Sequence, residues 1–219
     1  MKHRAEQAVQ KSGQTGVYQR LPDVHNNVLM YHSVGGSGHA NISTELFRTQ
    51  LDWLQETYEI VDLPEVLVQD DRKKVAITFD DGYESFYDSV IPILREYSVP
   101  ATLFVICKPL FDDSFTHDGA PKHERNYLTS DQLREIATDP YVTIGNHSMS
   151  HKNLSRSHPR STLQEEIVES KQVLEAECGV PIDRYCYPGN NWSPEARELV
   201  AAHHEYAVRG IGGRKFVTP

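Results

Sequence analysis

Long hydrophobic runs are absent from this sequence of 219 residues. Nowhere do about 18 apolar residues follow one another, which is the length that a helix needs to cross a membrane, and the sequence therefore predicts no membrane span. Residues 1–24 are polar and have no apolar stretch behind their basic residues, so they contain no export signal. As written, the chain is predicted to be cytoplasmic; if a leader has been removed from it, a periplasmic or cell-surface location follows instead.

Cysteine is scarce as well. The chain has three cysteines, Cys107, Cys178 and Cys186, which is an odd number and lacks CxxC spacing. This pattern indicates neither a disulfide framework nor a zinc site built from thiolates. We expect the three side chains to be small apolar residues of the core.

The sequence also has fewer positively charged residues than negatively charged ones. The chain has 22 Lys and Arg residues against 31 Asp and Glu residues, which gives a formal net charge of −9, and its basic residues form no cluster. A surface that follows nucleic-acid phosphates needs such a cluster, so we predict no nucleic-acid partner. A neutral or cationic partner is easier to accommodate.

The sequence does have the composition of a folded globular protein, with 38% apolar and 9% aromatic residues. We predict one domain at residues 25–219, preceded by a polar N-terminal arm at 1–24. Short apolar runs in the domain alternate with helical patterns. The runs predict seven strands, at 28–34, 58–63, 75–81, 101–107, 142–148, 184–188 and 206–209. The helical patterns predict helices at 83–97, 131–137 and 161–178 and a further helix from Pro194 onward. They also predict an earlier helix that begins at Ser43 or Thr44 and carries Leu46, Phe47, Leu51 and Leu54 on one side.

This alternation of strand and helix predicts parallel strands joined by right-handed crossovers. Periodicity alone allows either an open doubly wound sheet or a closed barrel. In both architectures the chemistry gathers at the C-terminal ends of the strands, where the connecting loops meet. The long irregular stretch at 108–127 is predicted to be an insertion loop over that end.

Polar residues that can bind a metal ion or take part in catalysis stand at the ends of four predicted strands. They are His32, the pair Asp80 and Asp81, His147 with His151, and Tyr187-Pro188-Gly189. Two histidines four residues apart, in G-N-H-S-M-S-H, have a spacing common among metal sites, although in isolation polar loop histidines are the commoner explanation. An aspartate from another strand would complete a ligand set of mixed nitrogen and oxygen type, which suits a hydrolytic divalent ion.

The adjacent aspartates need an explanation, because two neighbouring carboxylates repel one another. Successive residues at a strand end point in different directions, so one carboxylate can bind a metal ion while the other faces the water or substrate beside it. The charge of the ion would relieve the repulsion. The alternative is that both aspartates cap the helix that follows Gly82.

Taken together, these residues resemble the polysaccharide deacetylase family, also called the NodB homology or carbohydrate esterase family 4 group. Its first motif, T-F-D-D-G, stands unaltered at 78–82, and its second, His-Ser/Thr-x-x-His, stands at 147–151. The third, an aromatic-rich strand ending in Pro-Tyr-Gly, has the altered form Y-C-Y-P-G at 185–189. The resemblance covers about residues 28–210.

The resemblance implies a distorted (β/α)7 barrel, which agrees with the seven predicted strands. It also implies that Asp81, His147 and His151 bind a divalent metal, with Zn²⁺ the first choice and Co²⁺, Ni²⁺ or Fe²⁺ as alternatives, and that Asp80 is the catalytic base. The segment of the third motif would bind substrate and supply a backbone donor for the oxyanion; its residues here are Tyr187, Pro188, Gly189 and Asn190.

Apart from the altered third motif, the sequence departs from the family pattern in two places. The late Leu-x-His motif, whose histidine is the usual general acid, is missing, and the late residues His203 and His204 are expected to be solvated helix residues. One branch of the family, the poly-β-1,6-N-acetylglucosamine deacetylases, takes this acid from a Tyr-His sequence on the first strand, and L-M-Y-H-S-V matches it with His32. Alternatively, His32 only lines the pocket and has no catalytic role.

The second departure concerns the arginine that holds the base in many members of the family. Cys186 stands in its place, and Arg184 lies two residues earlier on the same face of the strand. Arg184 is either a substitute for the missing arginine or an exposed residue flanking the strand.

The predicted function is therefore that of a metal-dependent hydrolase that removes N-acetyl groups from an amino sugar in a polysaccharide or a glycan precursor. Two alternatives stay open at this point. One is hydrolysis of a non-sugar amide or imide, and the other is a carbohydrate-binding pseudoenzyme that has lost turnover.

Overall fold

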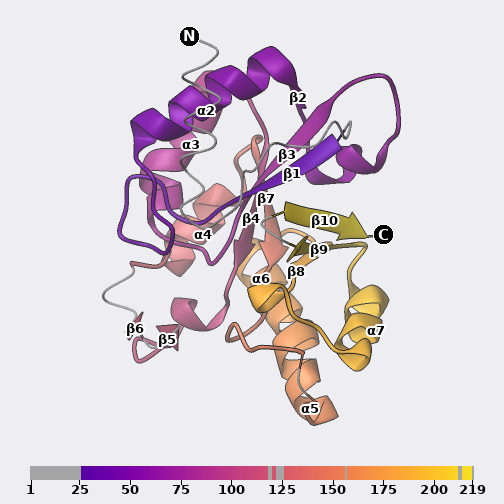
Figure 1. Ribbon diagram of the computed structural model, residues 1–219. Helices are drawn as coiled ribbons and strands as arrows, with labels where there is room; N and C mark the ends of the chain where they lie inside the picture. Colours follow the sequence, from indigo (N-terminus) through magenta and orange to yellow (C-terminus); the bar gives the residue numbers. More distant parts are fainter. Residues whose placement is uncertain (1–25, 118–119, 122–125, 156, 212–213, 219) are drawn as a thin grey trace.

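A computed structural model describes residues 26–117, 120–121, 126–155, 157–211 and 214–218 (Figure 1). The predicted N-terminal arm at 1–24 lies outside these residues. In the described part of the chain, a central curled sheet is surrounded by helices on its outer side. No helix in that part is long and apolar enough to cross a lipid bilayer.

The main sheet has the strand order β1-β3-β4-β7-β8-β9-β10, and β2 pairs with β3. The pairings from β1 through β9 are parallel. The strands are β1 (Asn26–Tyr31), β2 (Glu59–Ile60), β3 (Lys74–Phe79), β4 (Ala101–Val105), β7 (Val142–Asn146), β8 (Arg184–Cys186), β9 (Tyr206–Ile211) and β10 (Arg214–Thr218). Each of the seven predicted strands is present.

Helices cover the outer face of the sheet. They are α2 (Thr44–Thr57), α3 (Ile91–Tyr97), α4 (Ser130–Ile136), α5 (Arg160–Leu163), α6 (Ser170–Cys178) and α7 (Pro194–His203). Side-chain oxygens cap three of them: Ser43 caps α2, Thr129 caps α4 and Ser193 caps α7. Short 3₁₀ turns connect the strands at η1 (Leu63–Leu67), η3 (Lys108–Leu110) and η6 (Pro188–Asn190).

Two predicted helices contain a wider turn. A π-helical turn, η2 (Phe86–Val90), precedes α3, and another, η5 (Gln164–Glu169), joins α5 to α6. The helix predicted from residue 83 therefore begins later. Its first residues instead pair with the insertion loop through a bridge between Tyr83 and Tyr127.

Three strands were not predicted. Strand β10 runs antiparallel to β9 and lies beside β1, so it brings the two ends of the sheet towards one another. The insertion loop carries a small antiparallel hairpin of β5 (Thr116–His117) and β6 (Ala120–Pro121). These segments lack the alternating apolar pattern on which the other predictions rest.

The alternation of side chains along β3 separates two cores. Val75, Ile77 and Phe79 point outward into the large core beneath the helices, whereas Ala76 points into the interior of the sheet. The interior core is small; its buried residues are Val28, Val61, Leu63, Val66, Ala76, Phe104, Cys186 and Val208. This alternation decides which residues can reach the mouth of the barrel.

Cys107 and Cys186 are buried, as the sequence analysis expected, and Cys178 is half-buried. All three are free thiols. Their environments differ, because Cys107 lies in the outer core and Cys186 in the interior core, next to polar side chains.

Candidate functional site

Four strands each contribute an inward-facing polar side chain at or just beyond their C-terminal ends. In β3 the inward positions continue from Ala76 to Asp80, and in β8 the inward residue is Cys186. His32 and His147 follow β1 and β7 with the same two-residue alternation. Because parallel strands present their C-terminal ends at one edge, residues far apart in the sequence meet at one mouth.

Asp81 leaves the strand in an unusual conformation. Its φ angle is +78°, in the left-handed region that aspartate tolerates better than most residues, and Gly82 follows with φ +80°. This turn brings the Asp81 carboxylate to the two histidines of the loop after β7. Oδ1 of Asp81 lies 3.5 Å from Nε2 of His147 and 3.7 Å from Nε2 of His151.

These three side chains fit a divalent metal. Metal bonds of about 2.1 Å at a tetrahedral angle of about 109° separate two ligand atoms by about 3.4 Å, close to both observed distances. Oδ1 of Asp81 is also a buried acceptor without a hydrogen-bond partner in the described part of the chain, and burying such an atom is costly unless a cation meets it. The three predicted ligands therefore converge as one set.

The ring of His147 is oriented for this role. Its Nδ1 lies 2.8 Å from the carbonyl oxygen of Cys186 and donates to it, so Nε2 carries the lone pair that faces Asp81. Burial opposes ionisation of the Asp81 carboxyl, but its interactions with the imidazoles of His147, His32 and His151 outweigh this effect and hold the pKa of that carboxyl below its ordinary value. The site thus favours a carboxylate ready to meet a cation.

Two residues that the sequence analysis missed support the histidine loop. Oδ1 of Asn146 accepts from the backbone N–H of Ser148 at 2.8 Å. The fully buried carboxylate of Glu166, in the π-helical turn η5, accepts from the backbone N–H of Ser150 at 2.9 Å and also from its hydroxyl. No sequence pattern singles out Glu166, because an acid within a helix usually faces solvent.

His32 lies at the same mouth, half-buried and close enough for its charge to lower the pKa of Asp81. Its ring meets the ring of His39 edge to face, with 5.1 Å between centroids. The structure thus brings His32, the histidine after the first strand, close to the predicted metal ligand Asp81.

Asp80 is 4% exposed, and its Oδ2 lies 3.5 Å from Sγ of Cys186, which donates to it. Arg184 does not take the place of the missing arginine. Its guanidinium binds both oxygens of Asp62, at 2.6 and 2.7 Å, and the hydroxyl of Thr102. Arg184 is buried at the opposite end of the barrel, so neither role that the sequence allowed for it, base holder or exposed flanking residue, is correct.

The turn after β8 contains the four residues predicted for the oxyanion and the substrate. Gly189 and Asn190 both have left-handed backbones, with φ +57° and +62°. The N–H of Asn190 donates to the carbonyl of Tyr187 at 3.0 Å, and its side chain accepts from the N–H of Gly210 in β9. The turn is therefore fixed, and Pro188 is buried at its start. The Tyr187 ring packs into a separate hydrophobic cluster, with Tyr185 and Leu199 among its members.

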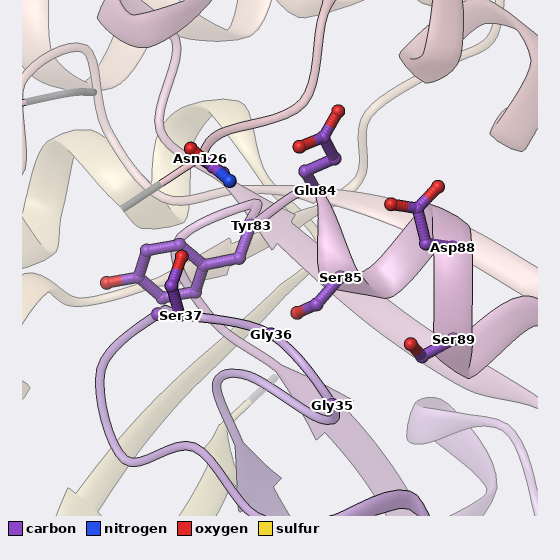
Figure 2. Close-up of a pocket in the computed structure, with 10 residues that line it drawn as sticks. Gly35, Gly36, Ser37, Tyr83, Glu84, Ser85, Asp88, Ser89 and Asn126 are labelled. Atoms are coloured by element: carbon purple, nitrogen blue, oxygen red, sulfur yellow. The ribbon is translucent and has the colours of Figure 1, made fainter. Parts of the chain in front are cut away.

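A pocket of about 190 Å³ opens beside this mouth (Figure 2). Its floor is the glycine-rich loop at 35–38, and the Tyr83 ring and the start of η2 form its wall. A Cβ atom on Gly38 would lie 2.6 Å from the ring of Tyr83, so the loop can approach only as glycine. The polar groups that line it are Ser37, Glu84, Ser85, Asp88, Ser89 and Asn126, and among the described residues no Lys or Arg lines it.

One sequence expectation was wrong. His204 is not a solvated helix residue; it follows α7, is 7% exposed, and its Nε2 accepts from the amide of Asn146 at 3.3 Å. Its ring also lies 5.1 Å from the ring of Tyr185. His204 thus belongs to the buried layer behind the histidine loop, whereas His203 is exposed as expected.

Burial, aided by the charge of Lys171, lowers the pKa of His204 to about 3 from its ordinary value of 6.5. The unfolded chain binds a proton below pH 6.5 that the fold does not accept, so this contribution to stability is complete above pH 6.5 and is lost as the pH falls towards 3. The expected loss is about 1.4 kcal/mol of unfolding free energy for each pH unit. Urea unfolding of wild type and His204→Gln, compared at several pH values, measures it.

Between pH 6.5 and pH 4.5 the free energy of unfolding should fall more steeply in wild type than in His204→Gln, because the other titrating groups are common to both proteins. His203→Gln is the matched control and should follow wild type. Equal slopes for wild type and His204→Gln would contradict the assignment.

Comparison with known proteins places these features in context. Residues 68–208 match the family model described as polysaccharide deacetylase. The protein YxkH of Bacillus subtilis, whose name assigns it to the polysaccharide deacetylases, is 30% identical over 155 residues, which are 68% of this chain and 50% of that protein. A poly-β-1,6-N-acetyl-D-glucosamine N-deacetylase of Staphylococcus aureus is 25% identical over 141 residues, 62% of this chain and 46% of that protein.

The chain thus spans about half the length of the curated relatives it matches. Among solved structures, IcaB from Ammonifex degensii superposes with a TM-score of 0.71 at 22% identity, covering 83% of this chain and 82% of that one. This likeness confirms the distorted (β/α)7 barrel of the NodB homology type.

Proposed function

Because the chain belongs to the polysaccharide deacetylase family, we propose that it is a metal-dependent hydrolase that removes N-acetyl groups from an amino sugar in a polysaccharide or glycan precursor. One observation carries the proposal: the imidazoles of His147 and His151 both face a buried carboxylate oxygen of Asp81. No hydrogen-bond donor meets this oxygen in the described part of the chain. Asp80 lies directly beside this set and is not needed to complete it.

A divalent ion held by Asp81, His147 and His151 would supply Lewis-acid chemistry, polarising the acetyl carbonyl and making water a better nucleophile. Zn²⁺ is the first candidate for this ion, with Co²⁺, Ni²⁺ and Fe²⁺ as alternatives. Asp80 accepts the proton of the attacking water as general base. Its inward direction, which it shares with Cys186, supports this role, because the carboxylate lies beside the proposed metal ligands.

The remaining roles fall to His32 and the turn after β8. His32 donates a proton to the departing amine, which is a poor leaving group without it. The backbone N–H of Gly189 is the proposed oxyanion donor, because the neighbouring N–H of Asn190 already donates to Tyr187. Pro188 and the side chain of Asn190 fix the turn that presents this donor.

The pocket of the glycine-rich loop favours a glycan over other amides. Hydroxyl, amide and carboxylate groups that line a pocket next to an aromatic ring suit the many hydroxyls of a sugar. Its two carboxylates, Glu84 and Asp88, disfavour an anionic ligand and accept a neutral or cationic one. We therefore propose that a sugar unit adjacent to the reacting one occupies this pocket.

Acetate release tests the function directly. Purified protein is expected to release acetate from oligomers of β-1,6-linked N-acetylglucosamine, the linkage for which one relative is named. A chelator should abolish the release, because the ligand set would be empty, and added Zn²⁺, Co²⁺ or Ni²⁺ should restore it. Enzymatic measurement of acetate with and without each ion gives the result.

Oligomers of β-1,4-linked N-acetylglucosamine and simple N-acetylated amines serve as comparison substrates. Release from a non-sugar amide alone would favour the amide or imide hydrolase. An absence of release from every substrate, with metal bound, would identify a pseudoenzyme and overturn the proposal.

A further inference from the structure

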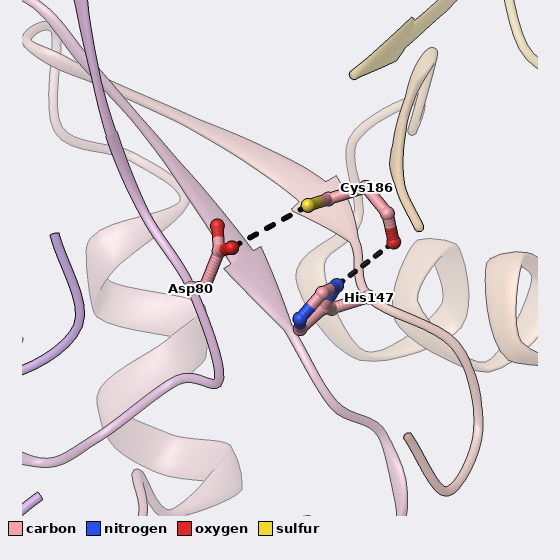
Figure 3. Close-up of side chains that lie close together, drawn as sticks. All are labelled: Asp80, His147 and Cys186. Carbon is pink, nitrogen blue, oxygen red and sulfur yellow. Dashed lines mark hydrogen bonds between the residues drawn. The ribbon is translucent and has the colours of Figure 1, made fainter. Parts of the chain in front are cut away.

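A second group of ligand-type side chains overlaps the first. Figure 3 shows Asp80, His147 and Cys186 facing one another at the ends of β3, β7 and β8. Oδ2 of Asp80 and Sγ of Cys186 are 3.5 Å apart, and each of the three residues offers a ligand atom within 4.8 Å of the other two. All three side chains are buried.

The separation of oxygen and sulfur matches that of two ligands on one ion. Bonds of about 2.3 Å to sulfur and about 2.1 Å to oxygen, at a tetrahedral angle of about 109°, place the two atoms about 3.6 Å apart. The observed 3.5 Å is also compatible with the thiol donating a hydrogen bond to Asp80. An ion would replace the thiol proton, which is released to solvent as the sulfur binds.

The two ligand sets differ in the type of one ligand atom, which is an imidazole nitrogen in the first set and a sulfur in the second. The first set offers two imidazoles and a carboxylate, whereas the second offers an imidazole, a carboxylate and a thiolate, which soft ions prefer. Nδ1 of His147 is committed to the carbonyl of Cys186, so its Nε2 serves both sets. One nitrogen lone pair binds one ion, and the two sets are therefore alternatives.

We propose that Asp80, Cys186 and His147 form a second metal-binding site, selective for thiophilic divalent cations such as Cd²⁺, whose occupation inhibits the protein. An ion bound there holds the carboxylate of the base and removes His147 from the first set. The inhibition rests on the proposed deacetylase function, but the binding does not. The substitution of cysteine for the expected arginine thus makes the base a metal ligand.

Cd²⁺ is the probe for this site, because cadmium bound to a thiolate absorbs in the ultraviolet through charge transfer from sulfur. The full chain, freed of metal by dialysis against a chelator, is titrated with Cd²⁺ while its difference spectrum is recorded. Wild type is expected to develop the thiolate band. Cys186→Ser should not develop it, and should bind Cd²⁺ at least about tenfold more weakly, because removal of an outer-shell partner alone costs that much.

Cys107→Ser is the matched control. Cys107 is another fully buried cysteine, but its thiol donates to the carbonyl of Ser170 and lies outside both ligand sets. Its replacement should leave the band intact. A wild-type protein that binds Cd²⁺ without a thiolate band, or a band of equal intensity in Cys186→Ser, would overturn the proposal.

Inhibition is measured separately on the Co²⁺-loaded protein, with each variant compared to its own activity without Cd²⁺. The concentration of Cd²⁺ that halves activity should rise at least about tenfold in Cys186→Ser, in line with the weaker binding. An unchanged concentration would contradict the inhibitory role. The thiolate band needs no substrate, so a chain that deacetylates no sugar but shows the band would refute the proposed function and leave the site standing.

Discussion

Replacing Asp80 by asparagine is expected to reduce acetate release by about 1,000-fold, within the range that a general base contributes. The change is small in structural terms, since Asn retains the size and the planar head of Asp while losing the ability to take a proton. Asp80 lies outside the set of Asp81, His147 and His151, so the variant should retain its metal. Turnover and metal content, measured on the same preparation, check the two expectations together.

Asp71→Asn is the matched control for this substitution. Asp71 is an exposed acid in the turn before β3, remote from the inward face of the sheet, and its replacement removes the same charge from the chain. It should retain wild-type turnover. Full activity in Asp80→Asn would refute the assignment of the base, and loss of metal from this variant would mean that Asp80 is a ligand in the working protein.

Asp81→Asn is expected to have the opposite pattern, losing the metal and the activity with it. Removal of a direct ligand should weaken metal binding by at least about 100-fold, the upper end of what an outer-shell partner costs. Asparagine is the informative replacement, because the φ angle of +78° is one that Asn adopts nearly as readily as Asp, whereas alanine would add backbone strain. Metal analysis after dialysis measures the loss.

An excess of metal ion further distinguishes the role of Asp81 from that of Asp80. A large excess of Co²⁺ should partly restore turnover in Asp81→Asn, because mass action refills a weakened site. The same excess should not restore Asp80→Asn, whose defect is the missing proton acceptor. If both variants responded equally to added metal, the division of roles between these adjacent residues would be wrong.

The strands that form the barrel, and the residues at their C-terminal ends, could be predicted from the sequence. The run V-A-I-T-F-D-D-G carries both a buried strand and its two aspartates, and H-S-M-S-H carries both histidines of the ligand set. Such segments are predictable because local pattern and tertiary role coincide in the same few residues. The two-residue alternation of a strand also gives the inward direction of Asp80.

Contacts between distant segments were not predictable in the same way. Whether Arg184 binds Asp80 or Asp62 depends on which end of the barrel its side chain approaches, and the strand pattern fixes only the face. His204 looked like a solvated helix end, but it turns inward to Asn146 once α7 has docked. Strand β10 was missed because its own residues lack an alternating apolar pattern, and its pairing with β9 is a tertiary contact that the local sequence does not indicate.

The π-helical turn η5 has a consequence for how this chain could diverge. A π turn holds one residue more than the α-helical path it interrupts, and such turns are frequent at functional sites. Deletion of a single residue there would restore the regular helix and rotate every preceding side chain by about 100°. Glu166 would then face away from Ser150, and the histidine loop would lose its anchor. The position of Glu166 therefore depends on the number of residues in this helix as well as on their identity.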